Sequence, residues 1–196
     1  LPKSKDLNNL NEYRPISVLP ILSKPLERHI HVHLSKFLEQ NHLLNSAQSG
    51  FRPNHSCQTA LTHIIDRWLQ AMNDERISGA IYLDLKKAFD LVNHSILLKK
   101  LSLYHLDSDA VAFFSSYLDN RQQKVYLNGN YSTEGQVTCG VPQGSILGPL
   151  LFIIFINDLP LSLTNPQVSC DLFADDTTLH TSNKSVLQVK SSLQES

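Results

Sequence analysis

The sequence of 196 residues lacks several features that would assign it to a familiar class of protein. Its three cysteines, Cys57, Cys139 and Cys170, form no Cys-x-x-Cys pair, so neither a zinc site nor a disulfide framework is indicated. Its longest apolar run, residues 146–156, contains a glycine and a proline and is too short to span a bilayer. The first residues show no signal peptide. We therefore expect an intracellular protein, in the nucleus or the cytoplasm, with reduced thiols.

Positive charge is absent from a long part of the second half of the chain. No lysine or arginine occurs between Val125 and Asn183. The acidic residues of this stretch are Glu134, Asp158, Asp171, Asp175 and Asp176. The net charge of −1 is thus the sum of a basic region and an acidic region. Such a division is typical of a protein that binds a polyanion with its basic part and metal cations with its acidic part. Chance segregation of solvated charges predicts the same pattern, so charge leaves both interpretations open.

The composition, with 41% hydrophobic and 18% charged residues, is that of an ordinary globular protein. Apolar spacing and capping residues predict the following helices: 23–40, 56–72, 95–104, 107–118, 143–159 and one that begins near Lys184. They also predict a buried strand at 77–85, two short strands around Asn128-Gly129, and a hairpin of 168–174 and 177–181 that turns at Asp175-Asp176. The longer strands are expected to form one antiparallel sheet with helices on its back face, which gives an α+β fold.

Three aspartates are the candidates for a metal site. Asp84 lies at the end of the strand 77–85, and Asp175 and Asp176 lie at the turn of the later hairpin. Clustered carboxylates repel one another unless cations neutralise them, and two Mg²⁺ ions about 4 Å apart would also activate an attacking hydroxyl. The alternative is a solvated turn, because aspartate favours turns. A P-loop nucleotide hydrolase is excluded, since no Gly-x-x-x-x-Gly-Lys-Ser/Thr segment occurs.

Five motifs follow one another along the chain and together suggest a family. They are Tyr13-Arg-Pro-Ile-Ser-Val-Leu-Pro20, Gln48-Ser-Gly-Phe-Arg-Pro53, Tyr82-Leu-Asp-Leu-Lys-Lys-Ala-Phe-Asp90, Gly140-Val-Pro-Gln-Gly-Ser-Ile-Leu-Gly-Pro149 and Phe173-Ala-Asp-Asp176. In this order and spacing the chain resembles the reverse transcriptase domain of non-LTR (LINE-type) retrotransposons over essentially its whole length. Group II intron maturases share part of the pattern, but residues 83–90 and 154–159 are more similar to the LINE-type group.

The resemblance implies a right-hand polymerase fold that is truncated before the thumb. Residues 1–60 and 93–145 would form a fingers-like subdomain. Residues 61–92 and 146–196 would form a partial palm, whose small antiparallel sheet is backed by helices. The chain would then be one segment of a longer polyprotein, with the thumb and nuclease regions outside it.

The resemblance also implies the activity of an RNA-directed DNA polymerase. The partners would be an RNA template, a DNA primer and deoxynucleoside triphosphates (dNTPs). By matching positions, Asp84, Asp175 and Asp176 would be catalytic and would hold two Mg²⁺ ions, or Mn²⁺, with the backbone carbonyl of Leu85. Asp175 is a firmer match to a metal ligand than Asp176.

Further residues match positions that contact the nucleotide. Lys3 and Arg14 would grip the triphosphate, because an arginine fork can bridge two phosphate oxygens. Phe89 would exclude a 2′-hydroxyl as a steric gate. Gln143 and Gly144 lie in a turn before an apolar helix, whose start would offer free N–H groups to an anion. The alternatives are surface cations, a core phenylalanine and a plain turn with a serine cap.

Template and primer contacts are implied for Arg52, Phe173 and Ala174. Arg52 would position the template backbone, and the small side chain of Ala174 would leave room for the primer ribose. Two other functions remain open. The chain is either a non-enzymatic remnant of a polymerase or an RNA-binding module that has lost catalysis.

Overall fold

The computed structural model describes residues 15–127 and 129–196, and these form two compact units. The first unit contains the described residues up to Leu34 together with Phe89–Phe152. The second unit contains Ser35–Ala88 and Ile153–Ser196. The division falls within helices α1 (Ser23–Gln40) and α5 (Leu147–Ile156), after Leu34 and after Phe152.

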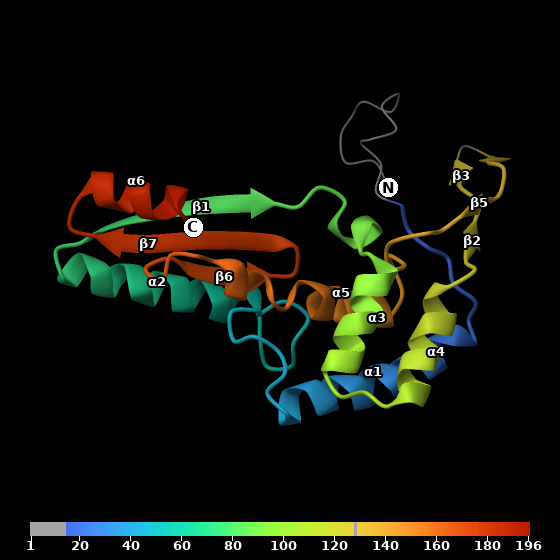
Figure 1. Cartoon of the computed structure of the whole chain (residues 1–196). Helices are drawn as coiled ribbons and strands as arrows, with labels where there is room; N and C mark the ends of the chain where they lie inside the picture. Colours follow the sequence, from blue (N-terminus) through green and yellow to red (C-terminus); the bar gives the residue numbers. More distant parts are fainter. Residues whose placement is uncertain (1–14, 128) are drawn as a thin grey trace. The chain divides into compact units, whose positions relative to one another are not determined.

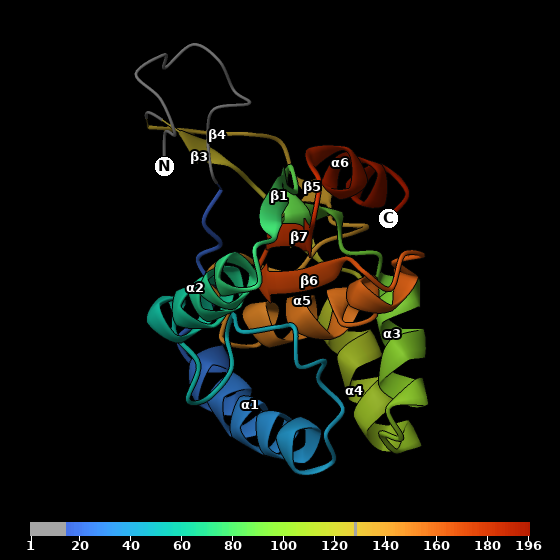
Figure 2. The same ribbon diagram turned by 90° about the vertical axis from the view of Figure 1, so that its left-hand side faces the viewer.

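The first unit is built on a pair of helices, α3 (His94–Leu103) and α4 (Ser108–Leu118), which pack against each other (Figures 1 and 2). Both helices were predicted, and both have a side-chain N-cap. The Asn93 side chain accepts from the N–H of Ile96, and the Asp107 side chain accepts from the N–H of Ala110. Their buried apolar residues recur four positions apart: Leu97 and Leu101 on α3, Phe114 and Leu118 on α4.

The segment after α4 contains more strands than predicted. The expected hairpin is present as β3 (Tyr126–Leu127) and β4 (Asn130–Tyr131), with Gly129 at a φ of +84° in its turn. A second pair, β2 (Gln122–Gln123) and β5 (Gly135–Gln136), forms outside it. The inner pair was recognised by its Asn-Gly turn, whereas β2 and β5 have no such turn between them and are too short to show an alternating pattern.

The second unit contains the predicted antiparallel sheet. Its strands are β1 (Ile77–Asp84), β6 (Ser169–Phe173) and β7 (Asp176–Asn183), in the order β1-β7-β6. The predicted position of the hairpin turn was wrong by one residue. Asp176 pairs in the ladder with both Asp84 and Phe173, so the turn consists of Ala174 and Asp175.

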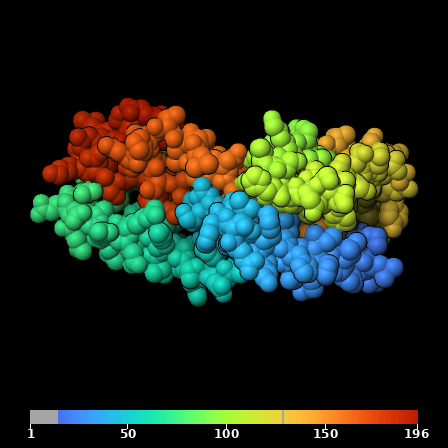
Figure 3. Space-filling model, turned by 60° about the horizontal axis from the view of Figure 1, so that its bottom comes forward, coloured from blue at the N-terminus to red at the C-terminus, as the bar shows by residue number. Residues whose placement is uncertain are grey.

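Helices cover both faces of this sheet and not only its back, which corrects the prediction. Helix α2 (Cys57–Asn73) and helix α6 (Val186–Gln194) lie on opposite sides of the strands (Figures 1 and 2). Helix α2 (teal to green in Figure 3) packs against all three strands of the sheet, β1, β6 and β7. The burial of β7 agrees with this, because Thr177 and Thr181 on one face and His180 on the other are all buried.

Strand β1 is less buried than its apolar sequence suggested. Tyr82 is 71% exposed and Leu83 is 42% exposed. The reason is position: β1 is an edge strand, and α6 packs closely at Gly79, where a Cβ atom would lie 2.4 Å from Val189. The half of β1 that leads to Asp84 therefore remains accessible.

Helix α5 is shorter than the predicted helix 143–159. Residues before Leu147 form a turn, and a short 3₁₀ helix, η3 (Leu159–Ser162), follows. The side chains of Leu150, Leu151, Ile153 and Ile154 are almost fully buried, as the apolar sequence predicts. None of the helices in the described part of the chain has the length and apolar character that a membrane span requires.

Candidate metal site and nucleotide-binding turn

Two of the three candidate metal ligands face each other across the sheet. Asp84, the last residue of β1, is the direct partner of Asp176, the first residue of β7. Opposed residues of an antiparallel pair point to the same face with Cβ atoms about 4.5–5.5 Å apart, and like charges in this arrangement destabilise the pair. Both side chains are exposed. Two opposed carboxylates open to solvent provide the oxygen donors that a hard divalent cation prefers.

Asp175 lies outside this register. It occupies the two-residue turn between β6 and β7, so no cross-strand pairing places it opposite Asp84. Within the described ranges, no three or more His, Cys, Asp and Glu side chains come close enough to hold a metal ion. Leu85 follows directly after β1, where its carbonyl adjoins the Asp84 end of the strand. A cluster of all three aspartates stays a prediction.

The turn that carries Asp175 has an unusual conformation. Ala174 adopts a φ of +59°, a left-handed value that L-residues other than glycine, asparagine and aspartate rarely take. The side-chain amide of Gln48 contacts this residue twice. Its Oε1 accepts from the Ala174 N–H at 3.1 Å, and its Nε2 donates to the Ala174 carbonyl at 3.4 Å. Phe173, predicted at the primer, is the last residue of β6 and is half-buried.

Arg52, predicted at the template, makes internal contacts. Its guanidinium donates to both carboxylate oxygens of Glu39 at 2.9 and 2.8 Å, and its Nη1 donates to the carbonyls of Asn45 and Gln48 at 3.0 Å each. The hydrogen bond from Arg52 lowers the pKa of Glu39 despite partial burial. The arginine thus supports the loop that contains Gln48, and its contact with a template stays a prediction.

Of the predicted nucleotide residues in the first unit, Gln143 and Gly144 lie in the turn before α5, and Phe89 contacts α5 itself. The ring of Phe89 stacks on that of Phe152 with centroids 4.4 Å apart, and it is half-buried. Gln143 donates from Nε2 to Asp90 Oδ1 at 2.8 Å. Gly144 has a φ of +104°, which favours glycine, and a Cβ atom there would lie 3.2 Å from the carbonyl oxygen of Ser17.

The start of α5 is not free for an anion, which corrects the prediction made for it. The Glu27 Oε2 accepts from the N–H groups of Ile146 and Leu147 at 2.7 and 3.2 Å. The Ser145 hydroxyl accepts from the N–H of Gly148 at 2.8 Å, in agreement with the predicted cap. Helix N-termini attract carboxylates because their N–H groups lack partners within the helix. Here a side chain of α1 supplies that carboxylate.

Lys3 and Arg14, the predicted triphosphate ligands, lie outside the described residues. Cys57, Cys139 and Cys170 form no disulfide bond with one another. Burial, and to a smaller extent the charge of Asp171, raises the pKa of the Cys170 thiol to about 11.

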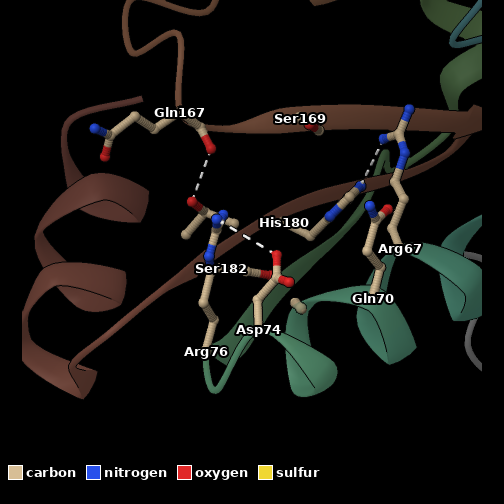
Figure 4. Close-up of a pocket in the computed structure, with 10 residues that line it drawn as sticks. Arg67, Gln70, Asp74, Arg76, Gln167, Ser169, His180 and Ser182 are labelled. Atoms are coloured by element: carbon tan, nitrogen blue, oxygen red, sulfur yellow. Dashed lines mark hydrogen bonds and ion pairs between the residues drawn. The ribbon is translucent and has the colours of Figure 1, made fainter.

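The second unit contains another polar region, around Asp171 and His180, that the sequence did not predict. His180 Nε2 lies 2.6 Å from Asp171 Oδ2, and because a carboxylate only accepts, this nitrogen carries the hydrogen. Arg67 Nη1 lies 3.7 Å from the same oxygen. His180, Arg67 and the Arg76–Asp74 ion pair line a pocket of about 380 Å³ (Figure 4). Asp171 and His180 are nine residues apart on different strands, a spacing that signals nothing by itself.

The motifs and the fold are explained by one family. Residues 1–195 match the family described as reverse transcriptase (RNA-dependent DNA polymerase), and the chain belongs to that family. Enzymes of this family generally use divalent metal ions.

Its relatives place it among the polymerases of mobile elements, which confirms the non-LTR group. It is 36% identical over 170 residues to the probable RNA-directed DNA polymerase from transposon X-element of Drosophila melanogaster, a match that covers 84% of this chain and 18% of the relative. It is 33% identical over 196 residues to the RNA-directed DNA polymerase from mobile element jockey of the same species, covering 97% and 21%. The chain thus spans about a fifth of the length of these relatives.

Solved structures with a similar fold include telomerases. The telomerase of Candida tropicalis has a TM-score of 0.57 at 16% identity, over 90% of this chain and 31% of that one. The telomerase of Candida albicans has a TM-score of 0.58 at 14% identity, over 88% and 32%. At these identities the likeness shows the fold alone, a mixed helix and strand fold of the kind found in these telomerases.

Proposed function

We propose that this chain is the core of an RNA-directed DNA polymerase of a non-LTR retrotransposon, which adds dNTPs to the 3′-hydroxyl of a primer paired with an RNA template. The observation that carries the proposal is the register of β1 and β7. It sets Asp84 opposite Asp176 at an accessible sheet end, with Asp175 in the adjoining turn. Like charges in direct opposition are costly in a fold unless they bind a cation.

The proposed metal ligands are Asp84, Asp175 and Asp176, with the carbonyl of Leu85, and the metal is two Mg²⁺ ions or Mn²⁺. The chemistry supplied at this site is a lower pKa for the primer 3′-hydroxyl and neutralisation of the leaving pyrophosphate. The protein contributes the spacing of Asp84 and Asp176, which the pairing of β1 with β7 sets.

Substrate contacts form the second part of the proposal. Phe89 would exclude a 2′-hydroxyl, and its stacking on Phe152 supports this because it restrains the plane of the ring. Gln143 and Gly144 would contact the nucleotide, and Lys3 and Arg14 its triphosphate. Arg52, Phe173 and Ala174 would lie near the template and primer.

The division into fingers and palm is also a proposal. The sheet with Asp84 and Asp176 lies entirely in the second unit, as a palm requires. The proposed fingers are residues 1–60 and 93–145, which include Gln143 and Gly144, and the proposed palm is residues 61–92 and 146–196, which includes Phe89. The two compact units divide the chain at other positions, after Leu34, Ala88 and Phe152. The RNA template, the primer and the remaining regions of a longer polyprotein would be the partners.

The deciding experiment is Mg²⁺-dependent extension of a DNA primer on an RNA template. It compares the 196-residue chain, and a longer protein that contains it, with the variants Asp84→Asn and Asp175→Asn. Each substitution removes a negative metal ligand and is expected to lower extension by at least ~100-fold. Asp66→Asn, at an exposed position of α2, is the matched control and should extend normally.

Extension that survives Asp84→Asn or Asp175→Asn would contradict the assignment of the carboxylates. If neither protein extends a primer but both bind template RNA in the presence of a chelator, the chain is an RNA-binding module and not a polymerase. Binding that is strongly reduced by salt is expected in either case, because phosphate contacts dominate affinity for nucleic acids.

A further inference from the structure

The loop that follows α1 pairs with β6, an edge strand of the three-stranded sheet. The N–H of Leu172 in β6 donates to the carbonyl of Ala47 at 2.8 Å, and the N–H of Ser49 donates to the carbonyl of Leu172 at 2.8 Å. Gln48 thereby pairs with Leu172 in a parallel bridge. This pairing places the Gln48 side chain two residues from the turn that ends β6.

Gln48 is completely buried, and its side-chain amide is used on both sides. Oε1 accepts from the N–H groups of Gly50 at 2.6 Å and Ala174 at 3.1 Å, and Nε2 donates to the Ala174 carbonyl at 3.4 Å. A buried amide must be satisfied by hydrogen bonds. Here it is satisfied by both peptide groups of one residue, Ala174, and by its own loop.

Ala174 needs such support because of its backbone conformation. At a φ of +59° its Cβ atom crowds the backbone, and the conformation persists only where surrounding structure holds it. Gly50 lets the loop come close enough to do so. A Cβ atom on Gly50 would lie 2.1 Å from the nitrogen and 2.8 Å from the Cα atom of Ala174, far inside contact distance.

The loop itself is anchored from behind. Arg52 donates to the Gln48 carbonyl at 3.0 Å and is held by Glu39 through two hydrogen bonds of 2.9 and 2.8 Å. With 11% of its side chain exposed, Arg52 can serve as a fixed support. A continuous series of hydrogen bonds thus runs from Glu39 of α1 through Arg52 and Gln48 to Ala174, the first residue of the turn between β6 and β7.

We propose that Gln48 is a positioning residue: its amide holds Ala174 in the left-handed conformation and so fixes where Asp175 and Asp176 stand. The role of these carboxylates in metal binding rests on the proposed function, whereas the effect of Gln48 on the turn does not. Gln48 touches neither substrate nor metal in this proposal. It acts only through the backbone of the hairpin.

The first measurement is amide hydrogen exchange, residue by residue, on the 196-residue chain. Gln48→Met has a similar length and shape, but it has no donor and only a weakly accepting sulfur. The amides of Ala174 and Gly50 are expected to exchange roughly tenfold faster or more in this variant, because each loses the Gln48 oxygen that accepts its hydrogen bond. Gln58→Met, the same change at an exposed position of α2, should leave them unchanged.

The second measurement is Mn²⁺ affinity, followed by paramagnetic resonance, together with primer extension by the longer protein that contains the chain. Gln48→Met is expected to weaken Mn²⁺ binding by about 10- to 100-fold, as loss of a supporting contact does at metal sites. It should lower kcat and leave KM for the dNTP almost unchanged. Gly50→Ala, which pushes on Ala174 without removing the amide, should have the same effects.

The outcomes separate the two proposals. Unchanged exchange at Ala174 in Gln48→Met overturns the role of Gln48, and so does an equal rise throughout β1 and α2, which would make it an ordinary core residue. Faster exchange with normal Mn²⁺ affinity overturns positioning of the carboxylates. If Asp84→Asn also leaves Mn²⁺ affinity unchanged, the proposed function fails, while exchange still decides whether Gln48 holds the turn.

Discussion

Two turns, one in each unit, carry predicted site residues. Each contains a residue at positive φ, but the two turns are stabilised in different ways. The turn before α5 contains Gly144 at a φ of +104°, and the hairpin turn contains Ala174 at +59°. Glycine reaches positive φ at no steric cost, whereas alanine does so only under restraint. Both turns therefore contain a small residue at positive φ, but only glycine adopts this conformation without strain.

The side chains that support the two turns differ accordingly. The Glu27 carboxylate accepts from two N–H groups at the start of α5, where a helix offers donors only. The Gln48 amide both accepts from and donates to Ala174, where a hairpin turn exposes an N–H and a carbonyl. The comparison teaches that the chemistry of a buried support follows the backbone groups that the turn leaves unpaired.

The strongest way to break this comparison is to remove the support of the first turn. Glu27→Ala leaves the N–H groups of Ile146 and Leu147 without their acceptor, and the free energy of unfolding is expected to fall by about 2–4 kcal/mol. Glu27→Gln retains an accepting oxygen, so its free energy of unfolding should fall by less. Urea denaturation measures the free energy of unfolding of both variants.

Glu134→Ala is the matched control in the same unit. Its carboxylate lies 3.8 Å from Lys124 and is half exposed, so the change should cost less than about 1 kcal/mol. A Glu27→Ala protein as stable as the wild type would show that the start of α5 needs no carboxylate.

Replacing Gly144 by alanine and Ala174 by glycine sharpens the comparison, because the two changes in the free energy of unfolding should differ in sign or size. Gly144→Ala adds a Cβ atom at positive φ, 3.2 Å from the Ser17 carbonyl, and should cost about 1–2 kcal/mol. Ala174→Gly relieves strain but adds chain entropy, so the unfolding free energy should change by less than about 1 kcal/mol. A large loss in Ala174→Gly would mean that the alanine methyl, and not the conformation, matters.

The smallest expected effect concerns acid sensitivity of the hairpin. Burial acts to raise the pKa of Asp171, but the His180 hydrogen bond and the positive charges of His180 and Arg67 outweigh it, and the net pKa is lowered. A carboxyl with a lower pKa in the folded state stabilises the fold above its ordinary pKa of about 4, and this contribution is lost as pH falls through the folded value.

Unfolding between pH 3 and pH 7 tests this. The free energy of unfolding of the wild type should fall below about pH 4. At pH 7 that of Asp171→Asn should be lower than the wild-type value by about 1 kcal/mol, and it should change less with pH. Asp66→Asn, at an exposed site of α2, should follow the wild type. An unchanged pH profile in Asp171→Asn would show that other carboxyls cause the acid sensitivity.

Local sequence determined most of the secondary structure and pointed to the family. Helix α1 has the predicted bounds, and Ser56 and Asp107 cap the helices that follow them, because apolar spacing and capping act within one or two turns. The antiparallel sheet and the Asp84 end of β1 were also predicted, since a strand and a tight turn are local patterns. The motif order was sufficient for the reverse transcriptase family.

Tertiary structure alone decided how the site is held. A one-residue difference in the turn made Asp176, and not Asp175, the partner of Asp84. The contact between Gln48 and Ala174 joins residues 126 positions apart, and that between Glu27 and Ile146 joins residues 119 apart. No local pattern encodes such pairs, because each exists only after packing has excluded water and left a buried backbone group that needs a partner.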